Sequence, residues 1–255
     1  MLPNFLVVGA EKAGTTTLAK ILSGHPEIFI PTFKESMFFS NHNWGKGIEW
    51  YESLFDEATG YKAIGEASPA YTWGSEKSGV PQRIFNTLGD IHYIYIVRHP
   101  IERMISHYYH ALYYKWVSPG TSFEDAIKAI PGIKSCSRYC YQIKKFQPYT
   151  QKEQWYVPIF ESLIQNPEAV QKAIFQFLNV DDQITISLPS ENVTDQKRIR
   201  PSWTRHLRGL KYIIPPSLRS SVRKNTYDVI GSKIVKPNIP EDQIHQQTEE
   251  IKEDI

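Results

Sequence analysis

The stretch FLVVGAEKAGTTTL, residues 5–18, decides how this chain folds. An apolar run ends at Gly9, a polar loop with Lys12 and Gly14 follows, and a helical pattern begins at Thr15. A strand, a glycine-containing loop and a helix N-terminus in this order present backbone N–H groups and a positive dipole end to an anion. The glycines let the backbone approach that anion closely, and the lysine adds a formal charge. The stretch therefore predicts a binding site for a nucleotide phosphate.

The loop differs from the Walker A pattern of ATP- and GTP-binding proteins, which places Gly-Lys-Ser/Thr after a glycine and four further residues. Gly9 and Gly14 have the right separation, but Thr15 stands at the lysine position. A magnesium-dependent NTPase also needs a carboxylate at the end of a neighbouring strand. The strand expected over residues 91–97 is followed by Arg98 instead. The kinase interpretation is therefore weak, and we expect no metal requirement.

Two motifs stand out, KAGTT at residues 12–16 and IVRHPIERMISHY at residues 96–108. The first resembles the 5′-phosphosulfate loop, and the second the 3′-phosphate site, of sulfotransferases that use 3′-phosphoadenosine 5′-phosphosulfate (PAPS). In that family an arginine at a strand end and a serine eight residues later hold the 3′-phosphate, as Arg98 and Ser106 would here. A guanidinium fork and a hydroxyl suit a phosphate monoester on chemical grounds as well. The donor site that the resemblance implies consists of Lys12, Ala13, Gly14, Thr15, Thr16, Thr17, Arg98 and Ser106.

Further segments resemble the heparan-sulfate-type and related bacterial branch of the family. They are residues 25–28, 34–39, 47–55, 65–71 and 166–180, so the resemblance extends over about 5–181. It implies a sulfuryl group transferred in line from PAPS to an acceptor, with 3′-phosphoadenosine 5′-phosphate (PAP) as the product. Such a site must deprotonate the acceptor and stabilise charge on the leaving phosphate. Lys12 and the loop amides are expected to do the second task, and Glu35, which matches the branch's catalytic glutamate, the first.

One departure from the family concerns its Glu-Lys-Thr-Pro motif, whose lysine assists the leaving group. Here the segment reads Glu66-Ala67-Ser68-Pro69, so that lysine is missing, as is the catalytic histidine of the cytosolic steroid and phenol enzymes. Either Lys12 acts alone or a basic residue from elsewhere contributes. Glu66 is a second candidate base, and the alternative is a buried acid that orients a loop.

The densest basic cluster of the chain lies late in the sequence, over residues 197–208. In the family a basic loop in this region closes over the 3′-phosphate, so the resemblance implies that Lys197, Arg198 or Arg200 binds it. A solvated basic helix face is the equally weighted alternative.

Two further pairs of titratable residues are interpreted as packing or solvated side chains and not as metal ligands. His107 and His110 are three apart on one helix face, but no third metal ligand is evident. Cys136 and Cys140 are four apart with no clustered histidines, which indicates two thiols and no zinc site.

Composition agrees with one enzyme domain over residues 1–255, in which 235–255 form a loosely packed C-terminal helix. The 255 residues can bury a full core, and the formal net charge of +2 is too small to indicate nucleic-acid binding. No apolar run approaches the roughly 20 residues of a membrane span, and residues 1–4 lead directly into the first strand. We therefore expect a cytoplasmic, bacterial enzyme without membrane contact, acting on a small molecule or saccharide. The sequence does not indicate an oligomeric state.

Strands alternate with helices along the chain, which predicts a three-layer α/β fold with a mostly parallel sheet. Ligands of such sheets bind beyond the carboxyl ends of the strands, where both phosphate motifs fall. The expected strands are 5–8, 28–30, 61–65, 91–97 and 155–160, and the expected helices are 15–23, 101–114, 121–130, 135–146 and 167–178. A rival of another class is a non-catalytic homologue that binds the nucleotide, which Ala67 suggests. The aromatic residues that suit acceptor recognition or core packing are Trp44, Trp50, Tyr71, Trp73, Tyr113, Tyr114 and Trp116.

Overall fold

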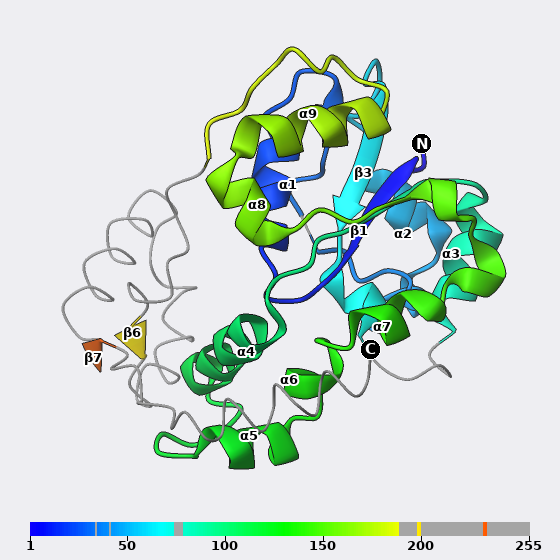
Figure 1. Ribbon diagram of the computed structural model, residues 1–255. Coiled ribbons are helices and arrows are strands. Elements are labelled where there is room, and N and C mark those ends of the chain that lie inside the picture. Colours follow the sequence, from blue (N-terminus) through cyan, green and yellow to red (C-terminus); the bar gives the residue numbers. More distant parts are fainter. Residues whose placement is uncertain (34, 41, 74–78, 189–197, 200–231, 234–255) are drawn as a thin grey trace, which may run out of the picture.

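A five-stranded parallel sheet, in the order β2-β3-β1-β4-β5, forms the centre of the computed structural model (Figure 1). Its strands are β1 (Phe5–Gly9), β2 (Ile28–Phe29), β3 (Ala63–Ala67), β4 (His92–Tyr95) and β5 (Trp155–Tyr156). The structure describes residues 1–33, 35–40, 42–73, 79–188, 198–199 and 232–233. Lys197, Arg200 and the expected C-terminal helix therefore lie outside the described residues. The expected α/β architecture is confirmed.

Helices cover both faces of the sheet, with α1, α8 and α9 on one side and α2, α3 and α7 on the other (Figure 1). The longer helices are α1 (Thr15–Ser23), α3 (Val80–Leu88), α4 (Pro100–Tyr114), α5 (Phe123–Ala129) and α9 (Pro167–Phe177). The shorter ones are α2 (Ile48–Ser53), α6 (Gly132–Ser135), α7 (Tyr139–Lys144) and α8 (Phe160–Gln165). Two-residue strands β6 (Arg198–Ile199) and β7 (Ser232–Lys233) pair antiparallel, and β6 lies beside α4.

The two central strands are buried along their whole length, as parallel strands covered on both faces are. β1 and β3 pair with Phe5 opposite Gly65, and a Cβ at Gly65 would lie 2.4 Å from Cζ of that ring. A glycine is required there because the phenyl ring occupies the space of a side chain. A second apolar cluster, separate from the sheet, joins α4 to α5 and α6 through Met104, Phe123 and Ile133.

Most expected elements are confirmed, and three expectations are wrong in detail. The helix expected over 135–146 begins only at Tyr139, with α7, because Ser137 turns inward between α6 and α7 and its hydroxyl accepts a hydrogen bond from buried Arg103 at 2.6 Å. The strand expected over 155–160 ends at Tyr156, since Phe160 already opens α8. The strand expected over 61–65 lies two residues later, and α3 was not expected at all.

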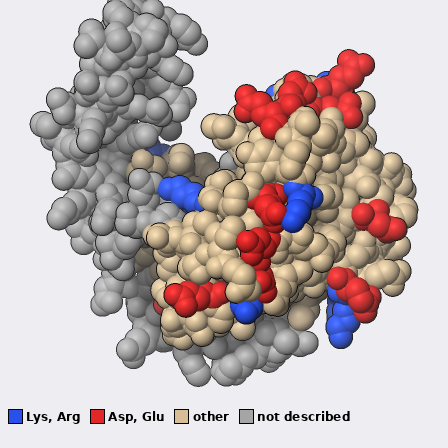
Figure 2. Space-filling view, turned by 90° about the horizontal axis from the view of Figure 1, so that it is seen from above, with Lys and Arg blue, Asp and Glu red and all other residues tan. Residues whose placement is uncertain are grey.

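Charge is scattered over the face seen in Figure 2, where described Lys and Arg side chains are separated by acidic and uncharged surface. No described helix is both long enough and apolar enough to cross a membrane. Within the described ranges, no group of three or more His, Cys, Asp and Glu side chains has the arrangement of a metal site. Cys136 is buried and Cys140 is exposed, and both are free thiols.

Candidate active site

The loop after β1 forms a tight turn that leads into α1. Lys12 and Gly14 both have positive φ, of 66° and 98°. A Cβ at Gly14 would also lie 2.3 Å from Cδ2 of Phe160, so both the backbone and the space favour glycine there. The turn places Thr15, Thr16 and Thr17 in the first turn of α1, whose N–H groups have no acceptor inside the helix. The turn thus brings the start of α1 to the carboxyl end of the sheet.

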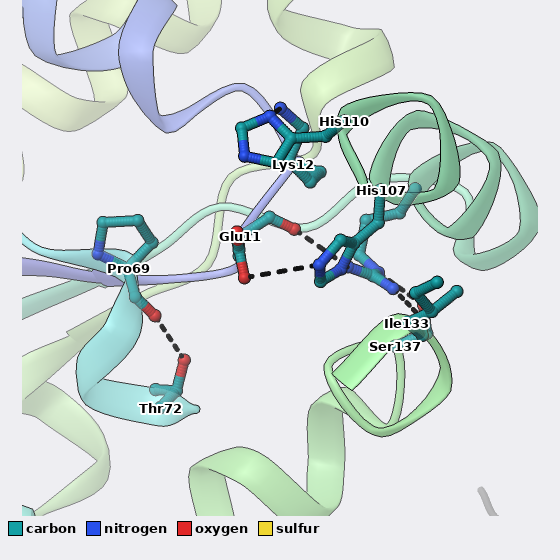
Figure 3. Close-up of polar contacts among 9 residues, drawn as sticks. Glu11, Lys12, Pro69, Thr72, His107, His110, Ile133 and Ser137 are labelled. Atoms are coloured by element: carbon teal, nitrogen blue, oxygen red, sulfur yellow. Dashed lines mark hydrogen bonds and ion pairs between the residues drawn. The ribbon is translucent and has the colours of Figure 1, made fainter. Parts of the chain in front are cut away.

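Lys12 reaches across the site to α4. Its Nζ lies 3.0 Å from Nδ1 of His110, and Figure 3 shows the two side chains meeting above the loop. A lysine ammonium only donates, so Nδ1 of the imidazole accepts in this contact. His110 was expected to be a packing or solvated residue, and the structure instead brings it to the loop lysine.

Beneath the loop, α4 contributes a buried arginine. Arg103 has no exposed surface, and its Nη1 donates to the carbonyl oxygen of Glu11 at 3.1 Å and to Nδ1 of His107 at 3.2 Å. It also donates to Ser137 and to the carbonyl of Ile133 (Figure 3). The arginine therefore fixes the loop backbone to α4 and α6 at the residue next to Lys12.

Glu11 and His107 face each other in this buried region, with Oε2 and Nε2 4.0 Å apart. Neither of these two atoms has a hydrogen-bond partner among the described residues. Burial raises the pKa of Glu11 against the opposing charges of Lys12 and Arg103. Burial, with the charge of Arg103, lowers the pKa of His107 to about 3. His107 is therefore neutral at pH 7, and since Nδ1 accepts from Arg103, its proton sits on Nε2 and faces Glu11.

Arg98 and Ser106, expected at the 3′-phosphate, border the same end of the sheet. Arg98 follows β4, lies 5.2 Å over the Phe160 ring, and places Nη2 3.3 Å from Oε2 of Glu102. Its Nε is buried and has no hydrogen-bond partner in the described part of the chain. Ser106 is half-buried two turns into α4. A buried guanidinium N–H without an acceptor fits a site for an anion, because an unmade hydrogen bond there is costly.

The two candidate bases lie in different surroundings. Glu35 is exposed, and its charge adds to the effect of burial in raising the pKa of Glu11. Glu66 is fully buried in β3, where it accepts hydrogen bonds from Tyr51 at 3.2 Å, from Ser68 at 3.4 Å and from Tyr71. Burial raises its pKa, and hydrogen bonds from Ser36, Tyr71 and Tyr51 oppose that rise. Its placement supports the alternative of a buried acid that orients a loop.

The segment that Glu66 orients is the one that carries Glu35. Ser36 donates to Glu66 and lies 3.1 Å from the Tyr71 hydroxyl, and the N–H of Met37 donates to Ser68 at 3.1 Å. The hydroxyl cluster therefore fixes the backbone immediately after Glu35.

The sequence-based site is only partly assembled by described residues. Lys12, the 13–17 turn, Arg98 and Ser106 follow the carboxyl ends of β1 and β4, and Ala67, the buried last residue of β3, lies at the same end of the sheet. Arg198 lies in β6, beside the helix that carries Ser106. Sequence reasoning missed Glu11, Arg103 and the loop contact of His110, although charged side chains at four-residue spacing on an apolar helix face were a usable signal.

Known proteins similar to this chain are sulfotransferases. The chain is 37% identical over 124 residues to a membrane-associated sulfotransferase, kil1, of Dictyostelium discoideum, covering 48% of this chain and 25% of that protein. It is 31% identical over 199 residues to human heparan sulfate glucosamine 3-O-sulfotransferase 5, covering 72% of this chain and 55% of that protein. The chain thus spans from about a quarter to about half the length of these relatives.

Solved structures give the same result. A sulfotransferase from Alicyclobacillus acidocaldarius is 25% identical, with a TM-score of 0.65 over 88% of this chain and 96% of that chain. The sulfotransferase domain from the curacin biosynthetic pathway, 17% identical with a TM-score of 0.53, shares the fold. The family model for the sulfotransferase domain matches residues 2–246. Because that match takes in nearly the whole sequence, the chain belongs to the sulfotransferase domain family.

Proposed function

We propose that this protein transfers a sulfuryl group from PAPS to a hydroxyl or amine of a small molecule or saccharide. The observation that carries the proposal is the convergence of two anion-binding elements at one end of the sheet. The Lys12 loop leads into α1 there, and Arg98 leads into α4. A nucleotide with phosphate groups at both its 5′ and 3′ positions has the charge pattern that such a pair would recognise.

The 3′-phosphate is assigned to Arg98 and Ser106. Nε of Arg98, which is buried and has no hydrogen-bond partner among the described residues, supports this assignment, as does the half-buried hydroxyl eight residues later. Arg198 is a further candidate, because β6 lies beside α4. The assignments of Lys197 and Arg200 remain sequence-based predictions.

The transfer itself is assigned to Glu35 and Lys12. The acceptor oxygen or nitrogen forms a bond to sulfur while the bond between sulfur and the bridging oxygen breaks, and that electron pair remains on the phosphate of PAP. Glu35 takes the proton that the acceptor loses. Lys12 and the loop amides stabilise the charge on the leaving phosphate. His110 orients Lys12 through the 3.0 Å contact between Nδ1 and Nζ. The imidazole is thus a second basic group beside Lys12, in a chain that has Ala67 in place of the family lysine.

The class of acceptor is proposed from the relatives. The human relative is named for the glucosamine of heparan sulfate, which favours a saccharide. The cytoplasmic location stays a prediction from the sequence.

A transfer assay with PAPS carrying ³⁵S tests the proposal, with the Glu35→Gln variant beside the unchanged protein. We expect transfer to at least one saccharide or phenol acceptor, reduced about a hundredfold or more in the variant, because general base catalysis contributes on that order. PAP binding should persist in the variant, since Glu35 is assigned no donor contact. Binding of PAP without transfer in either protein would favour the non-catalytic homologue, and phosphate transfer from ATP with magnesium would favour a kinase.

A further inference from the structure

Two large aromatic side chains at the end of α4 are exposed. Tyr114, the last residue of the helix, is 54% exposed, and Trp116 is 49% exposed. Lys115 between them has a φ of 59°, and the N–H of Trp116 donates to the carbonyl of Ala111 at 2.8 Å. The chain therefore folds back over the helix end and holds both rings at the surface. We name Tyr114 and Trp116 the aromatic shelf.

The aromatic shelf lies one side chain away from the loop lysine. The ring of His110 is 4.5 Å from that of Tyr114 and 5.1 Å from that of Trp116, centre to centre. The rings of the shelf are themselves 6.1 Å apart and inclined by only 32°. Nδ1 of the same histidine is 3.0 Å from Nζ of Lys12. A molecule stacked on the shelf would therefore lie beside the proposed sulfuryl position.

The direction of α4 places the shelf on the acceptor side. Ser106, His110 and Tyr114 follow one another at four-residue spacing and so share one helix face. Eight residues of α-helix separate the first from the last by about 12 Å, at about 1.5 Å per residue. Since Ser106 is assigned to the 3′-phosphate and Lys12 meets the middle of this row, the shelf lies beyond the phosphosulfate position. The donor nucleotide approaches from the other end.

The chemistry of the shelf fits a sugar ring. Tyrosine and tryptophan have an apolar face and a polar edge, and a pyranose has a face of C–H groups and a rim of hydroxyls. Both shelf rings are about half exposed, which suits a ligand that keeps its outer side in water. A flat apolar molecule is usually enclosed on most of its surface in its site, and an exposed shelf encloses only one face.

We propose that the aromatic shelf is a subsite that stacks on the pyranose ring of a saccharide acceptor and directs its hydroxyl or amine toward Lys12. This inference rests on the proposed function and adds the residues that select the acceptor.

The test is calorimetric titration of the protein, saturated with PAP, with an unsulfated glucosamine–glucuronate hexasaccharide and with chitohexaose. At least one of them should bind. Trp116→Ala and Tyr114→Ala should each weaken that binding about tenfold, the loss expected for about 1.4 kcal/mol of ring stacking. Trp116→Phe should retain most of the affinity. Phe85→Ala on α3, which removes another ring that is 41% exposed, should bind as the unchanged protein does.

Three results would overturn the proposal while leaving the proposed function intact, provided that PAP binds. They are the absence of binding by both saccharides, equal affinity in the shelf variants and the unchanged protein, and binding by 4-nitrophenol in place of the saccharides. PAP titration and thermal unfolding of each variant separate lost stacking from lost folding. Failure of PAP to bind the unchanged protein would instead overturn the proposed function, and the shelf with it.

Discussion

Burial raises the pKa values of both Glu66, which is fully buried, and Glu11, whose side chain is 19% exposed, but their surroundings differ. Around Glu66 the neighbours are neutral hydroxyls, and both carboxylate oxygens accept hydrogen bonds from Tyr51, Tyr71 or Ser68. Around Glu11 the neighbours are charged or titratable, and Oε2 has no hydrogen-bond partner among the described residues. The described residues satisfy the hydrogen bonding of both carboxylate oxygens of Glu66 but not that of Oε2 of Glu11.

We infer from this difference that the residues around Glu66 maintain the structure, whereas those around Glu11 interact with a ligand. A fully satisfied buried network is rigid, because any rearrangement leaves a polar group without a partner. Beside Glu11, the Lys12 ammonium and Nε2–H of His107 can donate to an anionic ligand, whereas a carboxylate oxygen can only accept. We therefore expect changes near Glu66 to affect stability first, and changes near Glu11 to affect turnover and ligand binding first.

The largest expected effect is the loss of the loop charge in Lys12→Met. Turnover should fall about a thousandfold, or about 4 kcal/mol of transition-state stabilisation, as when an oxyanion donor is removed. The free energy of unfolding should change by less than about 1 kcal/mol, since the side chain is only half-buried. Sulfate transfer rates and urea unfolding measure the two quantities. If Lys12→Met lowers the free energy of unfolding strongly but keeps its turnover, then the loop after β1 maintains stability and does not act in transfer.

Glu66→Ala should reduce the free energy of unfolding by about 3 kcal/mol, because the buried hydroxyls of Tyr51 and Tyr71 lose their acceptor. Glu66→Gln keeps one carbonyl acceptor and should lose about 1 kcal/mol. Urea unfolding of both variants measures these values. The glutamine variant should also retain most of the turnover. If it folds normally but loses turnover completely, then Glu66 is a catalytic base after all.

The buried histidine of the loop region should make the protein sensitive to acid. The pKa of His107 is about 3 in the folded protein against an ordinary value of 6.5. Above pH 6.5 both states are neutral there, and between 6.5 and about 3 only the unfolded state binds the proton. The contribution of His107 to the free energy of unfolding should then fall by about 1.4 kcal/mol per pH unit as the pH decreases, while Glu11 and Glu66, whose pKa values are raised, oppose this fall.

Unfolding in urea at several pH values between 7 and 5 measures that slope. His107→Gln lacks the titrating group, so its free energy of unfolding should depend less on pH over this interval. Parallel plots of the free energy of unfolding against pH for the two proteins would show that the pKa of His107 does not change on folding. The surroundings of Glu11 and His107 would then no longer differ in this respect from those of Glu66.

The smallest expected effect concerns the exposed end of the 3′-phosphate site. Glu102 is 56% exposed and lies 3.3 Å from Arg98, so Glu102→Gln should change the free energy of unfolding by less than about 0.5 kcal/mol. PAP affinity should rise about twofold, because a competing carboxylate is removed. Glu124→Gln, which breaks the similar 2.7 Å pair with Lys128 on α5, should leave PAP affinity unchanged. Equal effects of the two substitutions would argue against Arg98 as a phosphate ligand.

The sequence predicted the loop and the strand–helix order well, because both depend on local patterns. An apolar run, the glycine at position 14 and the threonines after it specify the turn into α1 without help from distant residues. The strand before Arg98 and the helix after it follow for the same reason.

The rest depends on contacts between distant segments. Arg103 looks like a surface residue of an amphipathic helix, yet it is buried because Ser137 and the Glu11 carbonyl supply its acceptors. The contact between Lys12 and His110 joins residues 98 positions apart. The break between α6 and α7 has the same origin, since Ser137, which lies in that break, contacts Arg103.

Thermal unfolding with PAP, set against ADP with magnesium, tests the central claim most directly. At about 100 times its dissociation constant, a ligand that binds only the folded state adds about 2.7 kcal/mol, which gives a clear rise in Tm. The account predicts this rise with PAP alone and its loss in Arg98→Ala. Stabilisation by ADP with magnesium, and none by PAP, would contradict the account.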